Sequence, residues 1–304
     1  MTPGNVRKLS GPIQKIGVVL RRRTSDVAEI VARLVTFSES RGVALRFEGG
    51  SPDVPSGAQA LDLEHEPVDL LLSLGGDGTM LRAARLGMPQ DIPVFGVNLG
   101  RLGFLTATPA KDLEVRLGEV LDGGAQIDRR FTIEAVVVGP DGKRSEPFEA
   151  LNDIVVHTAG AARVTALNLS VGRTEGREEI GSISADGVIL ATPTGSTAYS
   201  LSAGGPIIGP EVEGFVVTPI CPHSLAVRPL VLPAHEQIMV RSLDPGAKLQ
   251  LTVDGQVVCA VGPGEIVSVV RGSSEVSLVR VAGQTFFGTM SSKLNWAARP
   301  PERT

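Results

Sequence analysis

The sequence has only two cysteines, Cys221 and Cys259, and no Cys-x-x-Cys pair. Neither a disulfide framework nor a structural zinc site is therefore indicated, and a reducing compartment fits this composition. No uninterrupted apolar run is long enough to span a bilayer, and the N-terminal stretch lacks the apolar core of a signal peptide. These absences predict a cytoplasmic protein that does not contact a membrane.

An excess of positive charge is also lacking. The 29 Lys and Arg residues are outnumbered by 33 Asp and Glu residues, which gives a formal net charge of -4. Such a balance provides no overall attraction to nucleic acid. The one basic cluster, Arg21 to Arg23, has no aromatic neighbours that could stack on bases, so it is interpreted as a solvated loop. We expect no nucleic-acid partner.

Three common site motifs are missing. The chain contains no Gly-x-x-x-x-Gly-Lys-[Ser/Thr] and no Gly-x-Gly-x-x-Gly, so neither a Walker-type nucleotidase nor a Rossmann-type hydride transferase is supported. Ser196 stands in Gly-Ser-Thr-Ala rather than in the Gly-x-Ser-x-Gly elbow of many hydrolases. A dinucleotide, if one binds, is therefore expected to be a substrate.

The length of 304 residues favours two domains. From residue 15 to about residue 121, short apolar runs alternate with segments of helical spacing, which is typical of an α/β domain. Beyond residue 128 the chain consists mainly of short runs rich in Val, Ile, Leu and Thr, which favours β-structure. We predict an α/β domain at 1–125, a β-rich, sandwich-like domain at 126–285, and a C-terminal segment at 286–304 that returns to the first domain.

Individual elements follow from the same patterns. Strands are expected at 17–20, 43–47, 69–74 and 93–97, and later at 133–138, 153–157, 164–171 and 237–240. One helix is expected to be capped by Ser25 and ended by Gly42, a second to begin at Pro109 and end at Gly123, and a third to cover 291–298.

The sharpest motif is an apolar run, 70–74, that leads into Gly75-Gly76-Asp77-Gly78-Thr79 and then into a helical pattern from Met80. A glycine-rich turn at a helix N-terminus suits the phosphates of a donor. A carboxylate in such a turn is explained by chemistry: Asp77 can accept a hydroxyl proton or help to position Mg²⁺. For Gly-Asp-Gly alone, simple capping of the helix by Asp77 would be the better explanation.

Two further segments carry polar groups. Residues 186–206 form a β-run that enters a stretch crowded with Gly, Ser and Thr and containing the sole tyrosine, Tyr199, whose ring can pack on a flat base. Asn152 and Asp153 precede another strand and have the groups needed to bind an adenine edge and a ribose hydroxyl. Both segments are also compatible with ordinary turn chemistry.

Together these segments resemble the NAD kinase family, in the same order along the chain. The resemblance extends to 98–105, to the Pro-x-x-Pro-His-Ser-Leu stretch at 219–225, to 254–256 and to the C-terminal residues 286–296. It implies an α/β domain and a β-rich domain, as in the related diacylglycerol kinases, and a homodimer or homotetramer. The implied reaction is phosphorylation of the 2′-hydroxyl of the adenosine ribose of NAD, with ATP, another nucleoside triphosphate or polyphosphate as donor.

The resemblance also implies roles for individual residues. Asp77 matches the catalytic carboxylate, and Gly75, Gly76, Gly78 and Thr79 match the donor-phosphate loop. The positions that match NAD-binding residues are Asp77, Gly78, Asn152, Asp153, Arg163, Asp186, Thr197, Ala198, Tyr199, Ser202 and Gln256. Asp153 departs from the family's usual Glu, and Arg82 and His223 are further candidates. The family places this histidine near a subunit contact, and a structural turn next to two prolines explains it equally well.

Mg²⁺ is expected to arrive with the donor phosphates, because it keeps waters and few protein ligands. His65, His157 and His235 have no cluster partners in sequence, so no dedicated metal site is predicted. Two alternatives remain: a lipid or sphingoid kinase that shares the GGDGT loop, and a non-catalytic NAD(H) sensor. No amphipathic membrane helix supports the lipid kinase.

Overall fold

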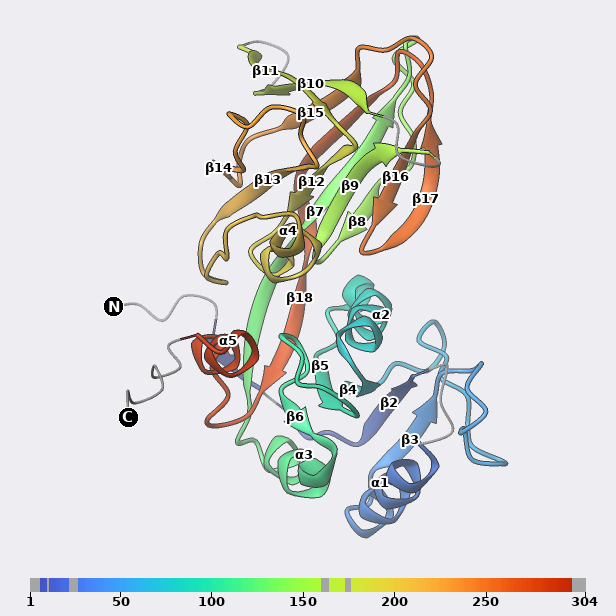
Figure 1. The fold of residues 1–304 in the computed structure, drawn as a ribbon. Coiled ribbons are helices and arrows are strands. Elements are labelled where there is room, and N and C mark those ends of the chain that lie inside the picture. The colour runs from blue at the N-terminus through green and yellow to red at the C-terminus, as the bar shows by residue number, and fades with distance from the viewer. Residues whose placement is uncertain (1–5, 10, 22–26, 160–163, 173–175, 297–304) are drawn as a thin grey trace, which may run out of the picture. The chain divides into compact units, whose positions relative to one another are not determined.

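The computed structural model describes residues 6–9, 11–21, 27–159, 164–172 and 176–296 (Figure 1). The chain forms two compact units, one of residues 1–129 and 276–304 and one of residues 130–275. Strands β7 (Gln126–Val138) and β18 (Ile266–Arg280) contain the two points at which the chain passes from one unit to the other. Within the described part of the chain, no helix is long and apolar enough to cross a membrane.

Unit 1 is built on a parallel sheet. Its strands follow the order β3 (Ala44–Phe47), β2 (Lys15–Leu20), β4 (Leu70–Gly75) and β5 (Val94–Asn98), and β5 also pairs in parallel with the end of β18. Every residue of β4 and β5 is buried, as expected for parallel strands covered on both faces. The short strands β1 (Val6–Lys8) and β6 (Thr108–Pro109) pair with β7 and β5.

Helices cover both faces of this sheet. Helices α1 (Ala28–Ser40) and α3 (Leu113–Leu121) share one apolar cluster with alternate residues of β2 and β4. Helix α2 (Asp77–Gly87) packs on the other face, since a Cβ at Gly96 of β5 would lie 3.0 Å from Sδ of Met80. One turn of 3-10 helix follows α2 at Met88–Gln90, another precedes α3 at Ala110–Asp112, and α5 (Phe286–Leu294) closes the unit.

Helix ends agree with the sequence in part. Gly42, at φ 67°, terminates α1 as predicted, and the N–H of Val43 donates to the carbonyl of Ser38 in a helix-closing bond. Ser25, the predicted cap, lies outside the described residues, and the residue before the helix is Val27. Helix α5 begins at Phe286, earlier than the predicted residue 291, because Thr285 Oγ1 accepts a hydrogen bond from the N–H of Gly288 and caps the helix there.

Unit 2 is β-rich. One antiparallel sheet has the order β14 (Leu230–Pro233), β13 (Gly214–Ile220), β12 (Gly187–Ala191), β9 (Asp153–Thr158), β16 (Leu249–Val253) and β17 (Gln256–Val261). The other strands of the unit are β8 (Phe148–Ala150), β10 (Thr165–Val171), β11 (Glu178–Ala185) and β15 (Ile238–Ser242), together with most of β7 and β18.

Alternating side chains explain why unit 2 has two sheets. Ile154 and Val156 of β9 join Val188 and Leu190 of β12 in one cluster that also contains residues of β7, β10, β15 and β18. The intervening residues, Val155 and Ile189 among them, form a second cluster with Ile208 on the opposite face. Strands β9 and β12 are therefore covered on both faces. The predicted class, an α/β region followed by a β-rich region, is confirmed.

Candidate active site

The glycine-rich turn between β4 and α2 is shorter than the motif alone indicates. The N–H groups of Thr79 and Met80 both donate to the carbonyl of Gly76, so the helix begins at Asp77 rather than near Met80. Gly76 is the residue before the helix and provides no side-chain cap. Asp77 and Gly78 consequently lie in the first helical turn, where the helix dipole favours negative charge.

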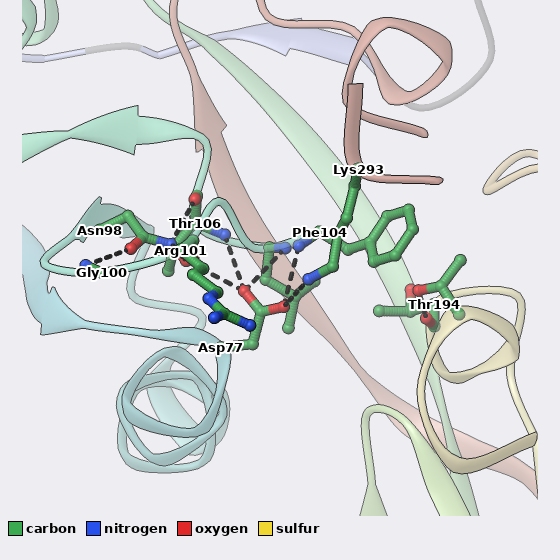
Figure 2. A network of polar contacts seen from close by, with 10 residues as sticks. Asp77, Asn98, Gly100, Arg101, Phe104, Thr106, Thr194 and Lys293 are labelled. Carbon is green, nitrogen blue, oxygen red and sulfur yellow. Dashed lines mark hydrogen bonds and ion pairs between the residues drawn. The ribbon is translucent and has the colours of Figure 1, made fainter. Parts of the chain in front are cut away.

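The Asp77 carboxylate is held by a loop that follows β5. Oδ2 accepts a hydrogen bond from the N–H of Phe104 at 2.8 Å. Oδ1 accepts three hydrogen bonds: from the N–H of Leu105, from the N–H of Thr106 and from Oγ1 of Thr106, at 3.0–3.1 Å (Figure 2). Asp77 therefore does not act as a cap for its own helix, and its carboxylate is fixed relative to residues 104–106.

The two carboxylate oxygens of Asp77 differ in what they can still accept. An ionised carboxylate has about four lone-pair sites, and Oδ1 already serves three donors. Oδ2 serves one backbone N–H, and the side chain as a whole is 32% exposed. Oδ2 is therefore the oxygen with remaining capacity to accept a proton from a hydroxyl group.

The loop that binds Asp77 is itself stabilised by a buried side chain. Asn98, at the end of β5, donates from Nδ2 to the carbonyl of Arg101 and to both the carbonyl and Oγ1 of Thr106. Its Oδ1 accepts the N–H of Gly100. Because Asn98 is only 5% exposed, these bonds form in a largely dry environment and keep residues 100–106 in one conformation.

The remaining candidate residues of unit 1 contact other residues of the same unit. Gly75 ends β4, and its carbonyl accepts the N–H of Leu99. Thr79 is buried in the first turn of α2. Arg82 lies one turn further and donates from Nε to Glu48 and from Nη2 to the carbonyl of Leu20, so its guanidinium is engaged within the unit.

In unit 2, the turn that carries Asn152 and Asp153 is organised by Asp254. The Asp254 carboxylate accepts the N–H groups of Leu151, Asn152 and Asp153 at 2.7–3.2 Å. Asp254 has φ 46° and, with Gly255, forms the two-residue turn between β16 and β17, the Asp-Gly pattern favoured in tight hairpins. One residue thus makes the turn and holds the backbone of the Asn-Asp pair.

Burial changes the chemistry of Asp153, which is 4% exposed at the start of β9. Desolvation, followed by the negative charge of Asp254, raises the pKa of Asp153 from 3.8 to about 7. Near neutral pH the carboxyl group is therefore divided between a form that only accepts hydrogen bonds and a form that also donates one.

The Ser- and Thr-rich segment meets the same turn. The N–H of Thr192 donates to the carbonyl of Asn152, and Oγ1 of Thr192 donates to the carbonyl of Leu151. A Cβ at Gly195 would collide with the backbone of Asn152, so only glycine permits this approach. The structure therefore brings Asn152 and Asp153 together with the short helical turn Gly195–Thr197.

The other candidate residues of this segment lie in this helical turn or shortly after it in the chain. Oγ1 of Thr197 donates to the carbonyl of Thr194. Ala198 connects this turn to helix α4 (Tyr199–Ser202), which Ser202 ends. Tyr199 is 47% exposed, so its ring can pack against a flat ligand. Gln256 lies beyond the Asp254 turn, at the start of β17.

Asp186 and His223 lie elsewhere in unit 2. Asp186 precedes β12 and Thr192 follows it, so about six residues of extended chain, roughly 20 Å, separate them. The N–H of His223 donates to the carbonyl of Ser184, which places this histidine on the side of Asp186. The structure therefore does not bring these two residues to the Asn152 turn of the same chain. Arg163 lies outside the described residues.

Comparison with known proteins places this geometry in a family. Residues 55–125 match the profile of the ATP-NAD kinase N-terminal domain, and residues 151–281 match that of the ATP-NAD kinase C-terminal domain. The NAD kinase of Gemmatimonas aurantiaca is 42% identical over 284 residues, covering 93% of this chain and 96% of that protein. The NAD kinase of Moorella thermoacetica is 37% identical, with 93% and 89% covered. The chain belongs to the NAD kinase family.

Solved structures of NAD kinases agree. Yeast NADH kinase, crystallised with NADH, superimposes with a TM-score of 0.84 at 27% identity, covering 96% of this chain and 90% of that one. An NAD kinase from Archaeoglobus fulgidus in complex with ATP gives a TM-score of 0.71 at 28% identity, covering 92% and 98%. The family assignment predicted from the sequence is confirmed, and nothing supports the lipid-kinase alternative.

Among the residues that the structure describes, no group of three or more His, Cys, Asp or Glu side chains is arranged to hold a metal ion. The Asp77 carboxylate is partly exposed at the head of α2. One such carboxylate together with substrate phosphates is the type of ligand set that Mg²⁺ usually takes. The residues present fit a metal that is held mainly by the donor.

Some contributors to these sites have no role that the sequence predicts. Asp254 belongs to the stretch 254–256 that resembles the family, and Asp-Gly between two apolar runs is also a hairpin signal. The amides of residues 104–106 carry no side-chain signature, because any residue type supplies a backbone N–H. Their part in holding Asp77 depends on how the loop after β5 folds.

Proposed function

We propose that this NAD kinase transfers the terminal phosphoryl group of ATP to the 2′-hydroxyl of the adenosine ribose of NAD and produces NADP. The observation that carries the proposal is the Asp77 carboxylate, fixed by three consecutive backbone amides at the start of α2. Family membership and the relatives named above support the same reaction.

In the proposed reaction, the ribose 2′-oxygen attacks the terminal phosphorus of the donor. A new O–P bond forms, the bond between that phosphorus and the bridging oxygen breaks, and ADP leaves. The hydroxyl proton passes to Oδ2 of Asp77, the oxygen with remaining acceptor capacity. Such a general base contributes about 10²–10⁴-fold to the rate, and alignment of the reacting groups supplies much of the remainder.

The donor phosphates are proposed to lie at the N-terminus of α2, near Gly75, Gly76, Gly78 and Thr79. No side chain caps this helix, and backbone N–H groups with the helix dipole attract anions. Mg²⁺ bound to the donor would neutralise part of the charge on the transferred group. ATP, another nucleoside triphosphate or polyphosphate fits this description, because recognition is directed at phosphate oxygens.

The NAD-binding residues are proposed in unit 2. Asn152 and Asp153 would contact the adenosine part, and Thr197, Ala198, Tyr199, Ser202 and Gln256 would line the remainder. Protonation of Asp153 near neutral pH allows its carboxyl to donate as well as accept a hydrogen bond with ribose.

The separation of Asp186 from the Asn152 turn favours an oligomer. The resemblance implies that Asp186 lies near the nicotinamide side of NAD and His223 near a subunit contact, and the roughly 20 Å along β12 makes a second copy of the chain the better source of both residues. We therefore propose a homodimer or homotetramer in which Asp186 and His223 serve a neighbouring subunit. A cytoplasmic location is part of the same proposal.

The decisive experiment is an assay of NADP formation by the purified protein with NAD and Mg-ATP. Polyphosphate then replaces ATP, NADH replaces NAD, and a sphingoid alcohol in micelles replaces the dinucleotide. NADP formation with no phosphorylation of the lipid alcohol is the expected result. Binding of NAD without turnover with any donor would instead identify a sensor.

A further inference from the structure

The ammonium group of Lys293 lies beside the catalytic carboxylate. Its Nζ is 4.0 Å from Oδ2 of Asp77, the oxygen with remaining acceptor capacity, and 4.9 Å from the centre of the Phe104 ring (Figure 2). The side chain is 34% exposed, so the charge is accessible to a ligand. Lys293 lies in the last turn of α5, far from the GGDGT motif in sequence but within the same unit.

Contacts with Phe104 keep Lys293 in this position. The Phe104 ring lies 6.4 Å from that of Phe286, at the start of α5, so the helix is anchored on the residue whose N–H binds Asp77. The ammonium rests over the same ring in a cation–π contact. Phe104 therefore fixes both the carboxylate, through its backbone, and the ammonium, through its side chain.

The Lys293 ammonium and the Asp77 carboxylate are too far apart to form a hydrogen bond with each other. A hydrogen bond between an ammonium and a carboxylate is about 2.7–2.9 Å long, whereas this pair is separated by 4.0 Å. Lysine has three N–H donors, and at this separation none is committed to a short bond with Asp77.

A phosphoryl group next to Asp77 creates an electrostatic problem. Its oxygens carry negative charge, and bringing them close to a carboxylate is unfavourable unless a cation lies nearby. The chain has no Gly-x-x-x-x-Gly-Lys motif that would supply a lysine from the phosphate loop itself. Lys293 supplies a cation at this place from another part of the sequence.

We infer that Lys293 is a further substrate-contacting residue of this site and that its ammonium binds the terminal phosphoryl oxygens of the donor beside Asp77. The inference rests on the proposed function, since it concerns the donor of that reaction. In this arrangement Lys293 offsets the repulsion between the phosphoryl group and Asp77 and holds the group where the hydroxyl attacks.

The test compares ligands that differ by the terminal phosphoryl group. Binding of Mg-ATP and Mg-ADP is measured by calorimetry for the parent, for Lys293→Met and for Lys293→Gln. Lys111→Met serves as a matched control, because Lys111 is another exposed lysine of unit 1. Loss of one charge-assisted contact predicts ATP binding weaker by about 10- to 100-fold, with ADP binding unchanged and the control equal to the parent.

Equal weakening of ATP and ADP, or no weakening of either, overturns the inference. A purely structural role would lower the unfolding temperature and affect both nucleotides alike, so thermal unfolding is recorded for each variant. If Lys293→Met does not fold, the comparison of ATP and ADP binding is made with Lys293→Gln, which keeps part of the side-chain stem. Lys293→Arg, which retains the charge, is expected to recover most of the preference for ATP.

The outcome is separable from that of the proposed function. Absence of NADP formation by the parent protein would refute the proposed function, whatever Lys293 does. A parent that forms NADP, combined with a Lys293→Met variant that still discriminates ATP from ADP as the parent does, would refute the role of Lys293 alone.

Discussion

Gly103 lies directly against the carboxylate of Asp77. A Cβ added to Gly103 would be 2.6 Å from Cγ of Asp77 and 2.5 Å from Oγ1 of Thr106, closer than real Cβ contacts. The loop therefore approaches the carboxylate so closely that it has no space for a side chain. This contact explains how three successive amides, 104–106, reach one carboxylate group.

Gly103→Ala is consequently expected to displace Asp77 or the loop that holds it. Misplacement of a catalytic group by about 1 Å costs on the order of 10²-fold in rate, so we expect a comparable loss of turnover in NADP formation. Gly100→Ala is the matched control in the same loop, because its added Cβ would meet only Oδ1 of Asn98, at 3.9 Å. Equal activities of the two variants would contradict the proposed positioning.

Asp77→Asn tests the carboxylate itself. The substitution removes the negative charge and turns an NH₂ group toward backbone N–H donors, so one oxygen remains for four hydrogen bonds. Turnover is expected to fall by about 10²–10⁴-fold, while NAD binding, measured by calorimetry, persists. Near-normal turnover would exclude Asp77 as the base.

A matched variant separates chemistry from stability in that experiment. Asp69 also accepts two backbone N–H groups in unit 1, those of Gln14 and Lys15, but it has no predicted role in the site. Asp69→Asn should lower the unfolding temperature without a comparable loss of turnover per folded molecule. If both variants lose activity in proportion to stability, the effect of Asp77→Asn is structural.

The sequence predicts the fold classes because its periodicities are local, and the buried runs of β4 and β5 illustrate this. It predicts less about contacts between distant segments. The GGDGT motif identifies Asp77, but the amides of 104–106 and the ammonium of Lys293 reach it only through folding. The opposite holds for Asp186. It belongs to the same sequence motif as Thr197, yet in the structure the extended strand β12 lies between the two residues.

Asp254→Asn tests how the Asn152 turn is held. Asparagine tolerates the positive φ of this position, so the hairpin turn should survive. The three N–H groups of 151–153 lose a charged acceptor, at an expected cost of about 1–3 kcal/mol in the free energy of unfolding. If the proposed function is correct, the KM for NAD rises more than kcat falls, because Asn152 and Asp153 lose their support.

Asp244→Asn is the control for that measurement. Asp244 is exposed and accepts the N–H of Gly246 in another turn of unit 2. We expect this variant to match the parent in its KM for NAD and to lose little stability in urea. Asp254 has no special role in the site if the two variants give the same kinetic constants.

The raised pKa of Asp153 makes the stability of the protein depend on pH. In the folded chain the pKa of Asp153 is about 7, and in the unfolded chain it returns to about 3.9. Between these two values the unfolded chain has released the proton while the folded chain retains it, so folding takes up a proton. The contribution of Asp153 is therefore most favourable below pH 4, weakens as pH rises, and is fully lost above pH 7.

Asp153→Asn should remove this dependence, because the amide stays neutral in both states. The difference between the folded and unfolded pKa values of Asp153 corresponds to at most about 4 kcal/mol, so the variant is expected to gain stability relative to the parent from pH 5 to about pH 7 and to keep a nearly constant advantage above that. Urea unfolding at pH 5, 6, 7 and 8 measures the difference. A difference between variant and parent that stays constant over this range would show that Asp153 is already ionised at pH 5, as an exposed aspartate is, and that its burial does not hold the proton.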